Sequence, residues 1–560
     1  KEFIFFEASE IPGTRLVDIV IKVKENISGI PDPETKLKRH FQYKINNAFF
    51  YPDFNFSRDL GSERDIGGDT VFIGDNIIVY AGKPKLRPDA VLGPNRCVPG
   101  SLYSLDNVKK TYNNYAAMGL ARIVNIHFRE LNTALTDTIP YKHIDAFIEI
   151  TPRKFQSYNI ELVGTNTIGD IGARTNISFN HHNLFSGAEN LQIRLSGAVE
   201  GGKRYDYYKP MWEIGIESIL GFPKLLVPFS AKRFSNKFNP HTLVNVSYNY
   251  QSRDYYIRTV ANTSFSYKFK GNQYTTHQFY PVEFNYVRLP EGIRDSAKRV
   301  LIENSNLRSS FSDHTILSTR YMFEFTTQSI ERKSDYFFVR TNLESAGNLI
   351  YGVSGLTPEH NDTTFLKVPF FRYFRFDIDL RYHNQLNKGS SIIYRIFSGA
   401  GYPLGGQRVL PYEKLYFGGG PNGLRAWESF GVGPGSDTTS KPFISSNKGE
   451  IRIEANIEYR FKFIWITEGA VFLDAGNMWT RYEWGEGSAF TWRNFYKEIA
   501  LGTGVGIRFD FSYFLIRTDF GFKLRDPKLP EGSRWIDLNR QVNYPLNRRF
   551  TFHFGIGYPF

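Results

Sequence analysis

The chain has 560 residues, a formal net charge of +13, 16% aromatic residues and a mean hydropathy of −0.37. No uncharged apolar run reaches the roughly 18 residues that a transmembrane helix needs, which excludes a helical membrane protein. The Lys and Arg residues are scattered among 56 acidic residues, so the charge favours a polar lumen or anionic lipid head groups over nucleic acid as its partner. This length also predicts at least two structural units.

The N-terminal region mixes strand and helix signals. Val17–Val23 alternates like a strand, and we interpret residues 1–38 as a linker or as the tail of a preceding module. Residues 39–154 are predicted to form one α/β module. Its strand signals lie at Phe41–Phe50, Val71–Tyr80, Ile123–Phe128 and Ile144–Ile150.

Two helices are predicted within this module. Ser104 is a candidate N-cap for a helix that ends before Gly119, and Arg87–Leu92 predicts a shorter helix. From Val71 onward the order is strand, helix, helix, strand, strand. This unit would offer a sheet edge to a partner strand, and the alternative is a spacer without binding activity.

From about Ser157 the texture changes to repeated strands of about ten residues, the length that a tilted strand needs to cross a bilayer. Between Ile451 and Phe461, apolar residues alternate with Arg, Glu and Asn. Such serial alternation is typical of a transmembrane β-barrel, which we predict for residues 155–560 with about sixteen antiparallel strands. The strands are expected near residues 157, 170, 190, 210, 241, 257, 278, 316, 334, 371, 390, 449, 466, 499, 513 and 549.

The connections alternate between long loops and tight turns, as in an outer-membrane barrel with its N-terminal module on the periplasmic, short-turn side. The connection at 222–240 is long where a short turn is expected, which leaves the strand pairing there open. The first strand is expected to be short and broken by Gly164 and Asn166.

The connection at 403–448 is too long for a simple hairpin and rich in glycine, so we expect it to fold into the lumen. Arg425 on this loop would then need carboxylate partners. Asp474 is the first candidate and Glu458 the second. The pair would hold the loop as an internal strut, and the alternative is an arginine exposed on a mobile surface loop.

The loop carries Gly423-Leu424-Arg425-Ala426-Trp427, and a later strand carries the spacing of Phe472, Asp474 and Gly476. In these motifs the chain resembles the BamA/TamA family of outer-membrane protein assembly factors, with Ala426 in place of the usual glycine. The resemblance covers essentially the whole chain and implies POTRA-type periplasmic modules before a sixteen-stranded barrel. It implies a strut made by Arg425, Asp474, Glu458, Trp427 and Gly423 and a strand motif at Phe472 and Gly476.

The last strand places Phe552, Phe554, Ile556, Tyr558 and Phe560 in one alternating series, which we expect to face lipid. Phe552, Tyr558 and Phe560 resemble the C-terminal targeting signal of outer-membrane barrels. The inner face would carry His553, Gly555 and Gly557, whose two glycines weaken pairing.

A weak seam between the first and last strands suggests a lateral gate, because unpaired strand edges are costly in lipid unless another strand can take them. The candidate gate residues are Tyr158, Ile160, Leu162, Gly164, Phe554, Gly555 and Gly557. The resemblance implies that client strands are templated at this seam, beside a thinned bilayer and without ATP. The alternative is that these glycines only mark barrel corners.

We therefore predict a Gram-negative outer-membrane assembly factor that folds and inserts, or translocates, β-barrel proteins. No catalytic constellation, metal site or cofactor site is found in the sequence, so an enzyme is not expected. The expected partners are unfolded outer-membrane proteins, outer-membrane lipids, and periplasmic or lipoprotein accessory subunits or an inner-membrane-spanning protein. The alternatives are a secretion pore of the two-partner type and, less favoured, a passive porin.

Overall fold

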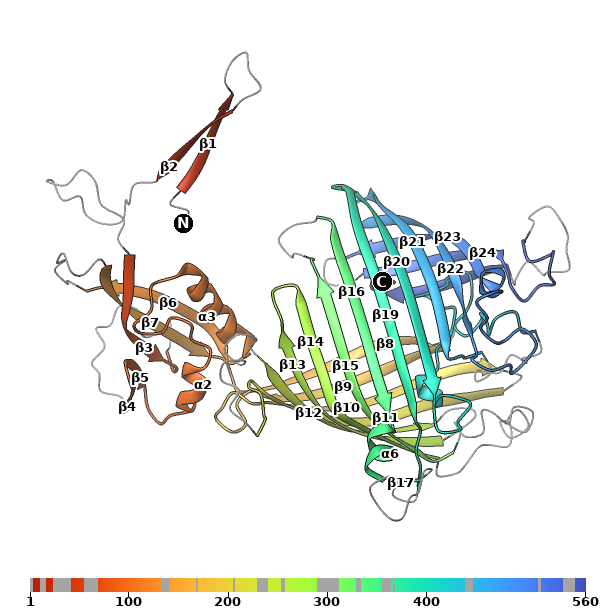
Figure 1. The fold of residues 1–560 in the computed structure, drawn as a ribbon, viewed down its shortest axis with the longest axis horizontal. Coiled ribbons are helices and arrows are strands. Elements are labelled where there is room, and N and C mark those ends of the chain that lie inside the picture. The colour runs from red at the N-terminus through yellow and green to blue at the C-terminus, as the bar shows by residue number, and fades with distance from the viewer. Residues whose placement is uncertain are drawn as a thin grey trace. The chain divides into compact units, whose positions relative to one another are not determined.

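The computed structural model describes the chain except residues 1–3, 11–16, 24–41, 55–68, 132–140, 168–169, 205–206, 229–239, 253–256, 290–311, 329–333, 355–363, 366–367, 439–446, 512–514 and 537–548. It divides into two compact units, Lys1–Lys154 and Phe155–Phe560. Each unit has its own sheet system (Figure 1).

The N-terminal unit opens with an antiparallel hairpin of β1 (Ile4–Glu10) and β2 (Val17–Val23). A five-stranded sheet follows, with the strand order β4-β5-β3-β7-β6. Parallel pairing of β3 with both β5 and β7 places β3 at the centre of this sheet. The strands are β3 (Gln42–Tyr51), β4 (Asp69–Ile73), β5 (Asn76–Tyr80), β6 (Ala121–Glu130) and β7 (Tyr141–Pro152).

Both predicted helices lie close to their expected positions. They are α2 (Pro88–Leu92) and α3 (Leu105–Ala117). Gly119, at φ +70°, adopts the left-handed conformation that glycine favours just after a helix. Tyr115 of α3 is buried, and its hydroxyl donates a hydrogen bond to the Val91 carbonyl, which ties the two helices together.

One strand prediction in this unit was wrong. Val71–Tyr80 is not a single strand but the greater part of the β4–β5 hairpin, which turns at Gly74 and Asp75. Gly74 has φ +60°, a conformation that glycine adopts without the Cβ clash of other residues. Apolar residues alternate on both sides of the turn, so the sequence pattern did not reveal the turn.

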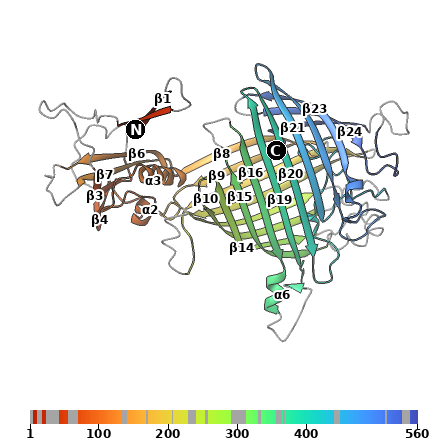
Figure 2. The ribbon, with the colours of Figure 1, turned by 45° about the horizontal axis from the view of Figure 1, so that its top comes forward.

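The C-terminal unit contains one antiparallel sheet of sixteen strands in sequential order from β8 to β25, which confirms the predicted barrel fold. Figure 2 shows the strands of this sheet running side by side around the unit. The strands are β8 (Gln156–Thr167), β9 (Asp170–His181), β10 (Asn190–Arg204), β11 (Tyr207–Phe222), β12 (His241–Ser252), β13 (Ile257–Lys270), β14 (Thr275–Arg288), β15 (His314–Thr326), β16 (Tyr336–Ala346), β19 (Tyr373–Asn387), β20 (Ser390–Pro403), β21 (Ile451–Ile464), β22 (Thr467–Trp479), β23 (Ala500–Asp510), β24 (Leu515–Arg525) and β25 (Phe550–Ile556).

Smaller elements lie in the long connections. Within the described residues they are α6 (Asn348–Ser354), the two-residue strands β17 (Thr364–Phe365) and β18 (Val368–Pro369), and the 3-10 turns η2 (Tyr412–Lys414) and η3 (Phe495–Glu498). In the part of the chain that the structure describes, no helix combines the length and apolar character needed to span a membrane.

The alternation of β21 separates two environments. Glu454, Asn456 and Glu458 are buried on one face, whereas Ile457 and Tyr459 are exposed on the other. A strand places successive side chains on opposite faces, so the charged residues point into the lumen and the apolar ones point outward. The membrane-facing wall and the polar interior both follow from this period of two.

Two expectations about individual strands change. β8 is not broken at Gly164, because it pairs with β9 without interruption from Gln156 to Thr167. The doubtful connection after β11 is bridged by regular antiparallel pairing of β11 with β12, from Trp212↔Ser252 to Phe222↔Thr242. Residues 229–239 of that connection lie outside the described part of the chain.

Candidate functional site

The loop between β20 and β21, residues 404–450, carries the Arg425 motif, and residues 439–446 of it lie outside the described part. Its tip closes on itself, since the Gly420 N–H donates to the Trp427 carbonyl at 2.9 Å. Gly419 and Gly420 have φ values of +90° and +95°, which residues with a Cβ rarely adopt. The tip therefore presents Arg425 in a compact turn.

Arg425 is fully buried and bonded to two lumen carboxylates, both also fully buried. Its Nε and Nη2 donate to the two oxygens of Asp474 at 2.9 Å and 2.8 Å, and its backbone N–H donates to Asp474 at 3.0 Å. Its Nη1 donates to Glu458. This bidentate geometry is the arrangement in which guanidinium and carboxylate bind most specifically.

The acceptors are neighbours because β21 and β22 are in a fixed register. Asn456 lies opposite Asp474, and Glu458 lies opposite Phe472. Asn456 Nδ2 donates both to Asp474 at 2.9 Å and to the Gly423 carbonyl at 3.0 Å. The strand pair thus holds both the arginine and the backbone beside it.

The other motif residues pack around this contact. The guanidinium of Arg425 lies 3.6 Å from the ring centroid of Phe472, a cation–π geometry. A Cβ at Gly476 would come within 2.5 Å of the Ile453 carbonyl. Trp427 is buried, and Lys523 Nζ lies 5.3 Å from its ring centroid.

A wider set of buried charges surrounds the pair, and the sequence analysis did not identify it. Arg460 Nε lies 2.6 Å from Glu458, and Arg508 Nη2 lies 2.8 Å from Asp519 and 3.4 Å from Glu458. Arg517 contacts Asp519 and donates to the Pro421 carbonyl of the loop tip at 2.8 Å. The alternation of apolar and polar residues in the sequence could have placed each of these residues on the inner face of the barrel. It could not have predicted that they form one cluster.

Glycines on β23 and β24 make room for the loop tip. The sequence analysis did not identify this role of the two glycines. A Cβ on Gly521 would lie 2.2 Å from the Arg425 carbonyl oxygen, and one on Gly502 would lie 2.4 Å from the Ala426 Cβ. Ala426 itself is fully buried. The wall at these positions is in direct contact with the loop, and only the absence of a side chain permits that approach.

The base of the loop has a second attachment, across β13, β15 and β16. Glu413 forms an ion pair with Arg258 at 2.7 Å, and His314 Nε2 lies 3.4 Å from the Glu413 carboxylate. Lys414 Nζ lies 2.6 Å from Glu344. The loop is therefore bonded to the wall at its tip and near its start, at strands far apart in the sheet.

Glu450 ends the loop where it meets β21. It is fully buried, and its carboxylate accepts a hydrogen bond from the Arg481 backbone N–H at 3.1 Å. Burial raises the pKa of Glu450 to about 7, an effect that the hydrogen bond from Arg481 only partly offsets.

The C-terminal residues differ from the prediction. Phe552, Phe554 and Ile556 are exposed on the outer face as expected. The alternation stops at Gly557, which has φ +82°, so the residues after it leave the strand.

Tyr558 and Phe560 therefore do not continue the lipid-facing series. The Tyr558 hydroxyl donates to Glu468 at 2.8 Å, and the Arg460 guanidinium lies 4.2 Å from its ring centroid. The ring centroid of Phe560 lies 5.5 Å from the guanidinium of Arg425. Both aromatic residues contact lumen charges.

The strands of the predicted seam, β8 and β25, are the two ends of the sixteen-stranded sheet, and within the described residues no pairing joins them. Tyr158, Ile160 and Leu162 of β8 are 73–78% exposed. On the inner face of β25, a Cβ at Gly555 would come within 2.8 Å of Arg517, and His553 Nε2 lies 3.2 Å from the Trp427 carbonyl. The last strand therefore contacts the loop tip directly.

Comparison with known proteins identifies one domain. The Omp85 superfamily domain matches residues 183–560. No curated protein matches the sequence. Among solved structures, BamA from Haemophilus ducreyi lacking POTRA domains 1–3 aligns over 99% of this chain and 89% of that chain, with a TM-score of 0.56 and 11% identity. CdiB from Acinetobacter baumannii aligns over 95% of this chain and 93% of its own, with a TM-score of 0.47 and 10% identity.

Proposed function

Because the chain belongs to the Omp85 superfamily, we propose that it is an outer-membrane assembly factor that folds and inserts, or translocates, β-barrel proteins at a lateral gate between β8 and β25. Membership of this superfamily supports a role in the insertion or translocation of proteins at the outer membrane. We further propose that the protein has a lateral gate, uses no ATP and catalyses no reaction.

The observation that carries the proposal is the unpaired seam. The described residues of β8 and β25 make no ladder with each other, although every strand edge in a bilayer must satisfy its backbone groups. A client strand can supply the missing partners by adding to either edge. Strand exchange of this kind replaces one set of backbone hydrogen bonds by another and needs no nucleotide.

The loop would act as a positioning element for this gate. Arg425 fixes the loop tip to β21 and β22, and the tip in turn meets β25 through Trp427 and His553. Loss of the strut would free the inner side of the last strand. We propose that residues 39–154, which contain the five-stranded sheet, form a POTRA-type periplasmic module. Its exposed edge strand β4 would receive clients or accessory subunits.

The test is reconstitution of the purified chain in lipid vesicles, followed by measurement of the folding rate of an unrelated urea-unfolded outer-membrane barrel. Empty vesicles and porin-containing vesicles serve as controls. Specific acceleration is expected. No acceleration together with a large steady conductance in a planar bilayer would instead favour the secretion pore or the porin.

A disulfide lock tests the gate itself. In a Cys97→Ala background, cysteines at Ile160 and Phe554 should cross-link β8 to β25 when the gate closes, and the cross-link should abolish acceleration until a reductant is added. The matched control joins Phe520 to Phe552, which already face each other across β24 and β25. Full acceleration by the cross-linked seam would contradict the gate.

A further inference from the structure

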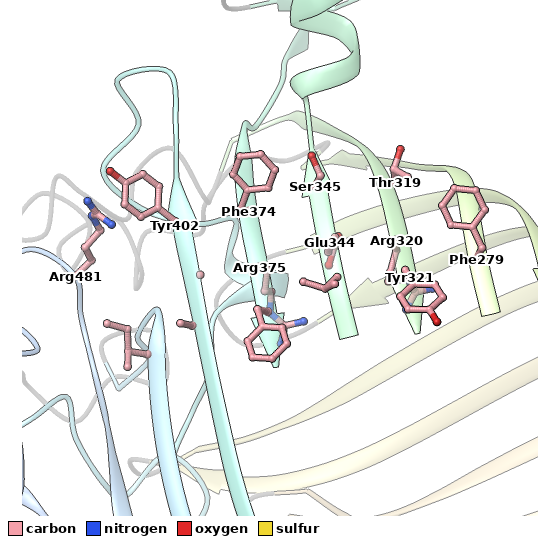
Figure 3. A pocket seen from close by; sticks show the side chains of 15 residues that line it. Phe279, Thr319, Arg320, Tyr321, Glu344, Ser345, Phe374, Arg375, Tyr402 and Arg481 are labelled. Atoms are coloured by element: carbon pink, nitrogen blue, oxygen red, sulfur yellow. The ribbon is translucent and has the colours of Figure 1, made fainter. Parts of the chain in front are cut away.

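A depression with a volume of about 530 Å³ lies on the outer face of the barrel wall, across strands β14 to β21. It involves none of the Arg425 contacts. Figure 3 shows Thr319, Ser345, Phe374 and Tyr402 side by side along it, with Arg481 next to Tyr402. Its size falls within the roughly 300–1,000 Å³ of small-molecule sites.

Strand register explains how the depression forms. Thr319 pairs with Ser345, Ser345 with Phe374, and Phe374 with Tyr402, so these four residues form a row across four strands. A second row runs through Tyr321, Leu343, Phe376, Ala400 and Ile451. In the first row the smaller Thr319 and Ser345 lie beside the large Phe374 and Tyr402, and in the second row Ala400 lies between Phe376 and Ile451. These smaller side chains hollow the surface beside the aromatic ones.

The hydroxyl groups of Thr319 and Ser345 in the depression are bonded within the protein, as is that of Tyr321, which lies 2.7 Å from His277 Nδ1. Thr319 Oγ1 donates to the Pro281 carbonyl at 3.0 Å, and Ser345 Oγ accepts from Asn348 Nδ2 at 3.0 Å. Arg320, Glu344 and Arg375 also line the depression, and they form ion pairs with Glu283, Lys414 and Asp377, respectively. The outward-facing side chains between them are mostly apolar, on a wall that we assign to the membrane. Lipid hydrocarbon is the occupant that suits such a lining.

Arg481 adds a charge at one end. Its guanidinium lies 3.4 Å from the ring centroid of Tyr402, and its Nε is buried without a hydrogen-bond partner. Among the described residues it forms no ion pair, and the neighbouring Glu450 accepts from its backbone N–H rather than from its side chain. The guanidinium is thus available to an anion beside the apolar depression.

An apolar surface gains little from lipid tails over other lipid tails, because both are equally apolar. Selectivity must therefore come from the shape of the depression and from the charged group at its end. Guanidinium binds phosphate with paired hydrogen bonds. The depression lies near the strand ends that lead into the long connections after β16, β20 and β22, which are expected on the outer surface.

We propose that this groove binds one acyl chain of a phosphorylated outer-leaflet glycolipid of the lipid A type, with a lipid phosphate on Arg481. The proposal rests on the membrane orientation proposed above but not on the gate. It adds a lipid site to the barrel wall, away from the seam. A lipid held there would keep one part of the wall in register with the outer leaflet.

The test is a titration of the purified full chain in detergent micelles with hexa-acylated lipid A, followed by native mass spectrometry. Ala400→Trp fills the groove, and Ala261→Trp makes the same change on the outer face of β13, outside it. Arg481→Gln removes the charge, and Arg493→Gln is its control in the same loop. Ala400→Trp and Arg481→Gln should each weaken lipid A binding about tenfold, the size expected for a lost charge-assisted hydrogen bond or contact, while both controls bind as the wild type does.

Equal binding by all five proteins would overturn the groove as the site. Phosphatidylglycerol that binds as tightly as lipid A, with the same dependence on Arg481, would overturn the glycolipid assignment. Heat-modifiable migration on electrophoresis checks that each variant is folded. The client-folding assay in phosphatidylcholine vesicles, which contain no lipid A, separates failure of this site from failure of the proposed function.

Discussion

Two parts of the same barrel wall carry inward-facing ion pairs in very different environments. On β10 and β11, Arg194 and Glu217 lie 3.2 Å apart with side chains 42% and 30% exposed. On β23 and β24, Arg508 and Asp519 lie 2.8 Å apart with side chains 0% and 1% exposed. The alternation of the strands is the same, and the difference is that the loop covers one part.

The comparison shows that the contribution of an inward-facing ion pair to barrel stability depends on whether other parts of the chain cover it. Exposed pairs contribute about 0–1 kcal/mol because water screens them. A covered pair interacts through a lower effective dielectric, and loss of one partner leaves the other charge buried and unpaired. By covering these lumen charges, the loop makes their ion pairs strong enough to attach it firmly to the barrel wall.

The largest expected effect comes from breaking the covered pair. Arg425→Ala should lower the free energy of unfolding by about 3–5 kcal/mol, because Asp474 and Glu458 lose their shared partner. Arg194→Ala, the control on the uncovered wall, should cost about 1 kcal/mol or less. The midpoint of heat-modifiable unfolding in detergent measures both, and equal effects would contradict the comparison.

The second largest difference between the covered and uncovered parts of the wall is expected when a single methyl group is added to a glycine. Gly521→Ala places a Cβ against the Arg425 carbonyl and should cost about 1–3 kcal/mol by overpacking. Gly197→Ala on β10 meets no heavy atom within 4 Å and should leave the unfolding midpoint near that of the wild type. A tolerant Gly521 would mean that the loop tip does not press on β24.

A charge exchange tests whether the contact is direct. Arg425→Asp combined with Asp474→Arg should recover part of the stability that each single change removes, because opposite charges face each other again. Glu458 then lies beside a carboxylate, so recovery is expected to be partial. A double variant whose loss equals the sum of the single losses would show that the two sites act independently.

The smallest effect concerns pH at the base of the loop. Since burial raises the pKa of Glu450 to about 7 from an ordinary value of about 4.3, the folded protein binds a proton between these pH values that the unfolded chain does not. Stability should therefore fall as pH rises from 4.5 to 7.5, by about 1–3 kcal/mol from this group. Unfolding midpoints at the two pH values measure the change.

Glu450→Gln should flatten that pH dependence. Glu428→Gln, at an exposed position in the same loop, should leave it as in the wild type. Parallel pH profiles for the wild type and Glu450→Gln would contradict a raised pKa.

Much of the fold could be read from the sequence because a strand alternates with a period of two and a barrel repeats that signal sixteen times. The starts of the strands were predicted within a few residues, since loop composition marks each end. Errors arose where alternation continued across a turn, as at Gly74, or where it stopped without a composition signal, as at Gly557. In both cases one glycine with positive φ redirects the chain.

The sequence by itself determined the barrel, the inward loop and the residue types of its attachment, because period, length and glycine content are local properties. Only the tertiary structure decided which inward charges meet. Arg460, Arg508, Arg517 and Asp519 come together through the register of four strands, and Gly502 and Gly521 matter only where the loop touches them. The inward turn of Phe560 and the depression on the outer wall likewise depend on neighbours that are distant in sequence, which no local pattern records.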